Sequence, residues 1–184
     1  MDILNLSKSK IKQDLLKLYF AHPEKQYYIR ELARILHRPA AYIRRELMNL
    51  EKIGLFASEF VGKEKFFKLN MNFLFYKEVK NIVNKTIGIE GRIKQILENG
   101  KNIEAAYIFG SYAKDKLTPE SDIDLLIIGQ KNNVDIHNKI YGLQTEFDRE
   151  INIIDIDGKE FAKRKKKKDE FLDEIFSNKI IKLV

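Results

Sequence analysis

The sequence lacks cysteine and long apolar runs, and proline occurs only three times in its 184 residues. Without cysteine there can be no disulfide framework and no thiolate zinc site. No stretch approaches the roughly 20 apolar residues that a membrane-spanning helix needs. The first residues also lack the basic start and apolar run of a signal peptide. We therefore expect a cytoplasmic protein that makes no contact with a membrane.

Positive charge is concentrated in two parts of the chain. The formal net charge is +7, and residues 1–70 carry 14 Lys and Arg against 8 Asp and Glu. Residues 71–184 are nearly balanced, although they include the basic run Lys163–Lys168. The basic N-terminal part indicates either a polyanionic partner or simply a soluble surface. The basic run is either a solvated helix face balanced by the acids of residues 169–174 or a surface that binds phosphate or nucleic acid.

The N-terminal part has the hydrophobic periodicity of three helices followed by two strands. The helices are expected over residues 7–21, 28–37 and 39–53, and the strands over 55–60 and 65–70. Pro39 suits the first turn of the third helix. Residues 61–64 are expected to form a hairpin turn between the two strands. The expected order is therefore helix, helix, helix, strand, strand.

The third helix has one apolar face and one basic, polar face. The apolar positions are three or four residues apart and predict a core face: Ala40, Ile43, Leu47, Leu50 and Ile53. The opposite face and its margin carry Arg38, Tyr42, Arg44, Arg45 and Asn49. Arginine and asparagine can read guanine and adenine edges, and tyrosine can reach phosphates. A helix of this kind is suited to the major groove of DNA.

The stretch YYIRELARILHRPAAYIRRELMNLEKIGLF and the hairpin after it resemble winged helix-turn-helix domains of bacterial and archaeal transcription regulators. The resemblance covers roughly residues 7–70. It implies binding to double-stranded DNA, a homodimer that reads two half-sites, and Lys63 and Lys65 near the DNA at the hairpin. Contact with another protein is the alternative use of such a domain. The basic outward face favours DNA.

The C-terminal part alternates between strands and helices. After a long helical stretch over residues 72–98, strands are expected over 105–109, 123–128, 151–156 and 179–184. Helices are expected over 111–116, 134–147 and 158–177. This alternation predicts an α/β layout for the C-terminal part, in a two-domain protein of the α+β or α/β class. The expected parts are a DNA-binding domain (1–71), a linking helix (72–98) and a third part (99–184).

The most informative motif is Gly110-Ser111, then ten residues, then Asp122-Ile123-Asp124. Glycine lets a backbone approach closely, and a helix start offers free N–H groups to phosphates, to which Lys114 adds positive charge. Two carboxylates two residues apart in a strand share one face. They suit Mg²⁺ held together with substrate phosphates. The motif therefore predicts a phosphate site and a magnesium site side by side.

Residues 90–184 resemble the minimal nucleotidyltransferase domains of the DNA polymerase beta superfamily. That resemblance implies a mixed sheet flanked by helices and a bound nucleoside triphosphate with Mg²⁺. It assigns the triphosphate to Gly110 and Ser111, and magnesium and catalysis to Asp122 and Asp124. With the N-terminal part, the chain resembles transcriptional regulators that carry a nucleotidyltransferase-like domain.

The superfamily also uses a third carboxylate on the next strand, where this sequence has Asn152. An amide cannot act as a base. Asp155 and Asp157 fall on the opposite face of a regular strand, and Glu150 has the right parity but lies one pair earlier. The leading hypothesis is a DNA-binding regulator that binds Mg-nucleotide. The alternatives are an active enzyme that transfers a nucleoside monophosphate to a protein, RNA or small-molecule hydroxyl, and an antitoxin-like interaction module.

Overall fold

The computed structural model describes residues 9–100, 102–114, 116, 118, 121–129 and 133–184. The chain forms two compact units, Met1–Gly88 and Ile89–Val184. Within the described ranges, no helix has the length and apolar character needed to cross a membrane. The division at Gly88 falls within residues 72–98, which were predicted as one linking helix and contain two shorter helices.

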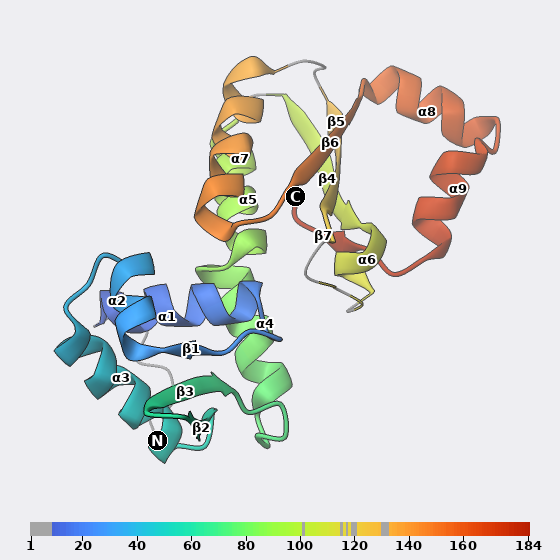
Figure 1. Ribbon diagram of the computed structural model, residues 1–184. Helices are drawn as coiled ribbons and strands as arrows, with labels where there is room; N and C mark the ends of the chain where they lie inside the picture. The colour runs from blue at the N-terminus through green and yellow to red at the C-terminus, as the bar shows by residue number, and fades with distance from the viewer. Residues whose placement is uncertain (1–8, 101, 115, 117, 119–120, 130–132) are drawn as a thin grey trace. The chain divides into compact units, whose positions relative to one another are not determined.

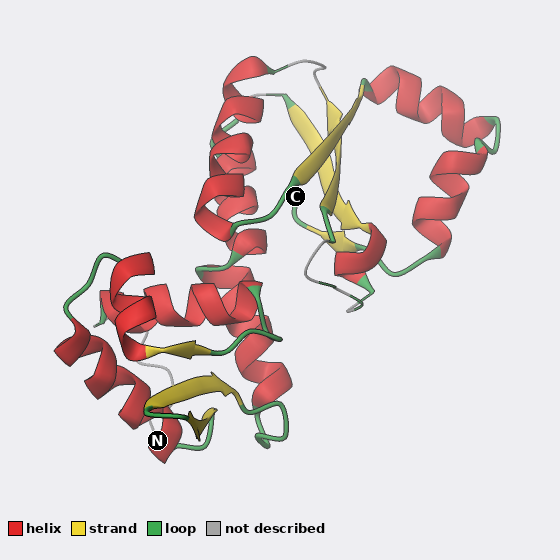
Figure 2. Cartoon of the chain, viewed as in Figure 1, coloured by secondary structure: helices red, strands yellow, loops and turns green. Residues whose placement is uncertain are grey.

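The first unit contains four helices and a small antiparallel sheet among its described residues (Figures 1 and 2). The helices are α1 (Lys10–Ala21), α2 (Ile29–Ile35), α3 (Ala40–Lys52) and α4 (Tyr76–Thr86). The strands are β1 (Tyr27–Tyr28), β2 (Phe56–Val61) and β3 (Glu64–Leu69), in the order β1-β3-β2. Strands β2 and β3 form the expected hairpin. Strand β1 was not predicted, because two residues are too few to show a period.

The core of this unit joins α1, α3 and the sheet. Tyr19 of α1 is fully buried, and its hydroxyl donates a hydrogen bond to the backbone oxygen of Phe67 at 3.0 Å. Burial raises the pKa of the Tyr19 phenol well above its usual range. On α3, Ile43, Leu47 and Leu50 are buried as predicted.

Two side chains of α3 differ from the predicted pattern. Ala40 is exposed, because it is the first residue of the helix and lies beyond the packed turns. Glu46 is buried instead. It accepts a hydrogen bond from the Ser9 hydroxyl at 2.9 Å, and its carboxylate lies 3.9 Å from Lys12 Nζ. The buried charge of Glu46 therefore has partners on α1 and at its start, which helical periodicity alone does not reveal.

The second unit is built on a four-stranded mixed sheet (Figure 2). Its strands are β4 (Ile103–Phe109), β5 (Ile123–Gly129), β6 (Ile151–Ile156) and β7 (Ile181–Lys182), in the order β6-β5-β4-β7. Only β5 and β6 run parallel. The helices are α5 (Ile89–Glu98), α6 (Gly110–Ala113), α7 (Val134–Phe147), α8 (Gly158–Lys166) and α9 (Glu170–Ser177). The mixed sheet flanked by helices confirms the coarse fold expected for this part.

Helices cover both faces of the sheet (Figure 1). On one face, α5 packs beside α7, and His137 of α7 meets Asp155 of β6. On the other face, Leu172 and Ile175 of α9 pack on Leu126 and other apolar side chains of β4, β5 and β6. Because side chains alternate along a strand, Asp124 and Asn152 belong to the face that α8 and α9 cover.

The helix predicted over residues 158–177 is two helices. Lys168 has a positive φ of 52°, and Asp169 caps α9 by accepting a hydrogen bond from Leu172 N at 3.2 Å. The basic run therefore ends α8, where its charges suit the negative end of the helix dipole. In the described part of the chain, Arg164 of this run pairs with Glu160, and no acid of α9 forms an ion pair with the run.

Candidate functional site

Two aspartates lie at the beginning of β5. Asp122 immediately precedes the strand, and Asp124 is its second residue. Asn152 lies opposite Asp124 on the parallel strand β6, and its Nδ2 donates a hydrogen bond to Asp122 Oδ2 at 3.2 Å. The structure thus brings both motif acids and the amide at the expected third-acid position to one place.

The surroundings of Asp124 disfavour its charge. Burial raises the pKa of its carboxyl above the usual value, and the neighbouring charge of Asp122 raises it further. A hydrogen bond from Asn152 acts in the opposite direction without cancelling the shift. Two carboxylates held this close repel each other unless a cation or a proton lies between them. The pair is therefore a place where a cation would relieve repulsion.

Gly110 brings the backbone close to Asp124. Its φ is +71°, and a Cβ at this position would lie 2.2 Å from Asp124 Oδ2. No other residue type fits here without displacing the carboxylate. The motif glycine and the motif acids are therefore one structural site. Ser111 is half-buried in α6, and Lys114 is exposed just after it. Because α6 has only four residues, the carboxylates of the motif acids, rather than a helix dipole, determine the electrostatics of this site.

Arg149 holds the segment that leads into the acids. It is 7% exposed, and its Nη1 donates to the backbone oxygens of Thr118 (3.0 Å) and Ser121 (2.9 Å). Ser121 directly precedes Asp122, so this contact helps to position that carboxylate. Arg149 could not be predicted from the sequence, because its partners lie about thirty residues earlier in the chain.

Removing the guanidinium of Arg149 is expected to destabilise the second unit. Arg149→Met keeps an apolar stem but removes the side-chain donor to the backbone oxygens of Thr118 and Ser121, so unfolding in urea should cost about 1–3 kcal/mol less. The matched control is Arg164→Met, which removes an arginine that is 42% exposed. That change should stay within about 0.5 kcal/mol of wild type. Equal effects of the two changes would mean that Arg149 does not anchor this segment.

The acids that were weighed as substitutes for a third carboxylate lie elsewhere. Asp155 Oδ2 is 2.7 Å from His137 Nε2, on the face covered by α7. Asp157 caps α8 by accepting from Lys159 N at 2.9 Å. Glu150 is exposed and precedes β6, where its backbone oxygen accepts from Ile123 N at 3.0 Å. The position beside the two aspartates belongs to Asn152.

The donor set at this site fits magnesium that arrives with a nucleotide. Among the described residues there is no group of three or more Asp, Glu, His or Cys arranged to hold a metal ion. Magnesium in proteins commonly uses one or two carboxylates and takes its remaining ligands from water and substrate phosphates. Asp122 and Asp124 would supply those carboxylates, and the ion would neutralise charge on the phosphates. A tightly held metal without nucleotide does not fit this arrangement.

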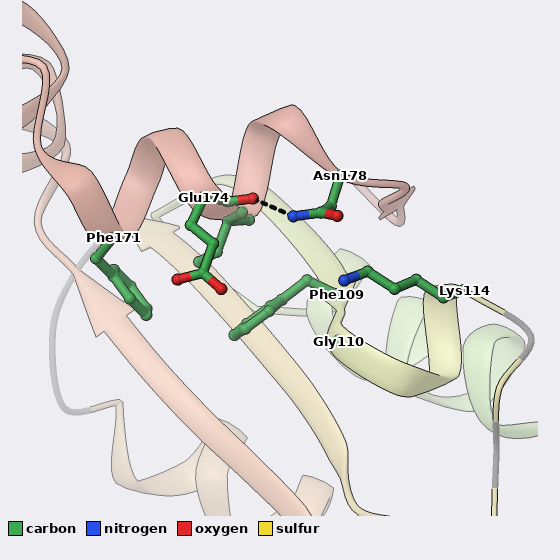
Figure 3. A pocket seen from close by; sticks show the side chains of 7 residues that line it. Phe109, Gly110, Lys114, Phe171, Glu174 and Asn178 are labelled. Carbon is green, nitrogen blue, oxygen red and sulfur yellow. Dashed lines mark hydrogen bonds between the residues drawn. The ribbon is translucent and has the colours of Figure 1, made fainter.

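A pocket opens beside Gly110 on the α9 side of the sheet (Figure 3). Its volume is about 190 Å³, and its lining is Phe109, Gly110, Lys114, Phe171, Glu174, Ile175 and Asn178. The rings of Phe109 and Phe171 meet edge to face at 6.4 Å. Of the residues expected to contact a nucleotide, Gly110 and Lys114 line this pocket. The α9 residues of this lining could not be predicted, because nothing in the sequence pairs that helix with β4.

In the first unit, two residues expected on the DNA-reading surface are engaged by acids. Arg38 donates two hydrogen bonds to Asp14 Oδ2, at 3.0 and 3.2 Å. Lys65 Nζ lies 2.9 Å from Glu51 Oε2. Hydrogen bonds from Ser58 and Lys65 lower the pKa of the Glu51 carboxyl. Both pairs tie α3 or its start to a neighbouring element, which gives these cations a structural role.

The other residues expected on this surface are exposed. They are Tyr42, Arg44, Arg45 and Asn49 on α3 and Lys63 in the hairpin turn. The guanidinium of Arg45 lies over the Tyr42 ring, 5.4 Å from its centroid. A cation stacked on an aromatic ring is held in place while its N–H groups remain available to a ligand. This surface, the α3 face, is defined by these five residues.

Several solved structures resemble this chain at low sequence identity. No curated protein matches the chain. Among solved structures, a toxin-antitoxin structure with AMP-PNP is 19% identical over 52% of this chain and 72% of the other, with a TM-score of 0.38. MepR, a transcription regulator of the Staphylococcus aureus multidrug efflux pump MepA, is 15% identical over 54% and 72%, with a TM-score of 0.39. Scores this low carry no argument about function.

The decisive comparison is with protein families. The family model described as "Polymerase beta, Nucleotidyltransferase" matches residues 91–182, which is half of the chain. The matched residues include Gly110, Ser111, the two aspartates and Asn152. The chain therefore belongs to the polymerase beta nucleotidyltransferase family.

Proposed function

We propose that this chain is a DNA-binding regulator whose nucleotidyltransferase-family unit binds a nucleoside triphosphate with Mg²⁺ as a sensor. The observation that carries the proposal is the side-chain amide of Asn152. It donates a hydrogen bond to Asp122, one of the two aspartates of the intact motif. Two carboxylates are enough to hold magnesium on a triphosphate. A neutral amide cannot remove the proton from an acceptor hydroxyl. We therefore expect this site to bind the nucleotide with Mg²⁺ without catalysing transfer.

The alternative is an active enzyme that moves a nucleoside monophosphate from the triphosphate to a hydroxyl, with pyrophosphate as the leaving group. Membership in the family and the intact Asp122–Asp124 pair favour it. In such an enzyme magnesium would neutralise charge on the phosphates. Removal of the proton from the acceptor hydroxyl would need another base. The candidate is the exposed carboxylate of Glu150, the residue directly before β6.

One experiment separates the two functions. The full chain is incubated with Mg²⁺, a cell extract as the source of acceptors, and each of the four radiolabelled nucleoside triphosphates. Nucleotide binding is measured in parallel by equilibrium dialysis. We expect Mg²⁺-dependent binding without transfer of label. Transfer that the change Asp122→Ala removes would establish the enzyme, and the absence of binding would refute both functions.

The proposed DNA-binding role rests on the first unit. Three helices precede an antiparallel hairpin, and α3 turns its apolar side inward and its exposed cations and polar groups outward. This order of elements supports the proposal of a winged helix whose third helix would enter the major groove. We propose that two copies of the chain bind two half-sites, as symmetric operators require. Arg44, Arg45 and Asn49 would contact base edges or phosphates, and Lys63 would contact the backbone.

Arg45→Ala is expected to weaken binding to a duplex operator selected from genomic DNA. The loss should be about 1–3 kcal/mol in binding free energy, because Arg45 can make a paired contact to a base edge. The measurement is a fluorescence-anisotropy titration at fixed salt. The matched control is Arg30→Ala, which removes an arginine side chain that is 82% exposed on α2. Equal affinity of Arg45→Ala and wild type would place the DNA surface elsewhere.

A further inference from the structure

We infer that the pocket beside Gly110 receives the base of the bound nucleotide and selects guanine. This inference rests on the proposed binding of a nucleoside triphosphate at the neighbouring aspartates. Phe109 is the register partner of Asp124 on the adjacent strand, and Gly110 lies against the Asp124 carboxylate. The pocket that these two residues line therefore adjoins the acids directly. A ligand bound at the aspartates therefore lies beside this pocket.

The size of the pocket suits one part of a nucleotide. Its volume is about 190 Å³, whereas pockets for whole drug-sized ligands measure about 300–1,000 Å³. Two of the lining side chains are aromatic, Phe109 and Phe171. Flat aromatic rings hold nucleobases by stacking. Lys114 is the cation among the lining residues, and it follows α6 beside the expected triphosphate position. The pocket thus combines a surface for a base with a charge for phosphates.

Glu174 gives the pocket its selectivity. In Figure 3 its carboxylate points away from α9, on the side where the rings of Phe109 and Phe171 lie. Asn178 does not compete for this carboxylate, because its Nδ2 donates to the backbone oxygen of Glu174 at 2.7 Å. Within the described residues, Glu174 has no ion pair or side-chain hydrogen bond. An ionised carboxylate only accepts hydrogen bonds, and its two oxygens can accept a paired set of donors.

Guanine is the base that offers two adjacent donors on one edge, its N1–H and its N2 amino group. Adenine and cytosine each place a ring nitrogen lone pair beside the amino group, and that lone pair would face a carboxylate oxygen. Uracil has one N–H between two carbonyl oxygens, which the carboxylate would repel. Hydrogen bonds to a charged acceptor are stronger than neutral ones. A base with the wrong edge leaves the carboxylate poorly satisfied, so the pocket discriminates.

The test compares nucleotide affinities of the full chain in Mg²⁺ by equilibrium dialysis. Wild type should bind GTP about tenfold or more tighter than ATP. ITP keeps N1–H but lacks the N2 amino group, so its affinity should fall between the two. Glu174→Gln replaces one acceptor oxygen by a donor and should reduce GTP affinity to the level of ATP. The affinity for ATP should not fall, because the Gln amide can accept from the adenine amino group and donate to its ring nitrogen.

The matched control is Asp173→Asn, which removes the same charge from the adjacent position of α9 but does not line the pocket. It should keep the preference for GTP. Mg²⁺-dependent binding with equal affinities for GTP and ATP would overturn this inference and leave the proposed function intact. A preference that survives Glu174→Gln would also overturn it. If no nucleotide binds in Mg²⁺, the proposed function itself fails.

Discussion

Asp122→Ala should abolish Mg²⁺-dependent nucleotide binding. The change removes one of two carboxylates at a site that, among the described residues, has no third acid to replace it. It also removes the carboxylate oxygen that accepts a hydrogen bond from Asn152 Nδ2 at 3.2 Å. Loss of a residue that only hydrogen-bonds to a metal ligand typically lowers metal affinity about 10–100-fold, so loss of a ligand itself should cost at least as much. Equilibrium dialysis with labelled nucleotide, with and without Mg²⁺, measures the effect.

Asp135→Ala is the control for this prediction. It removes a carboxylate from the same unit, but one that is exposed on α7 and paired with Lys139 at 2.6 Å. Nucleotide binding should stay at the wild-type level. Circular dichroism of both variants checks that each is folded. Unchanged binding in folded Asp122→Ala would mean that the aspartates are not the magnesium ligands, and the site assignment would be wrong.

The sheet of the second unit could be predicted from sequence because each long strand has a clear apolar pattern. Helix α7 and strand β6 have the predicted bounds, since apolar runs and turn residues mark both of their ends. The fused prediction over residues 158–177 failed, because helical periodicity continues through the turn between α8 and α9. A positive φ at Lys168 and a cap at Asp169 break the helix there. Neither the positive φ nor the helix cap has a strong sequence signature within a charged stretch.

The candidate site could be predicted only where its residues are close in sequence. Gly110, Asp122 and Asp124 belong to one short motif, and strand parity correctly separated Asn152 from Asp155. Arg149 reaches the segment before Asp122 through backbone oxygens, which have no sequence signature. The pocket depends on α9 packing against β4. Long-range packing of this kind follows from the tertiary fold and not from local periodicity.

Asn152→Asp is expected to raise transfer of label in the assay with cell extract. The new carboxylate would lie opposite Asp124 on the adjacent strand, where the family places its third acid. A carboxylate at this position can accept the proton of an acceptor hydroxyl, and general-base catalysis typically contributes about 10²–10⁴-fold. Without Mg²⁺, three neighbouring acids should repel each other and lower the thermal stability of the second unit. Mg²⁺ with nucleotide should restore it, because binding stabilises the folded state.

Two further variants make this prediction specific. Asn152→Ala removes the amide without adding a base, so it should show no gain in transfer. Glu150→Gln tests the alternative, because its exposed carboxylate is the other acid near the start of β6. If wild type already transfers label as fast as Asn152→Asp, and Glu150→Gln abolishes that transfer, the chain is an enzyme that uses Glu150. If only Asn152→Asp gains activity, a single amide in place of an acid separates this nucleotide-binding unit from a catalyst.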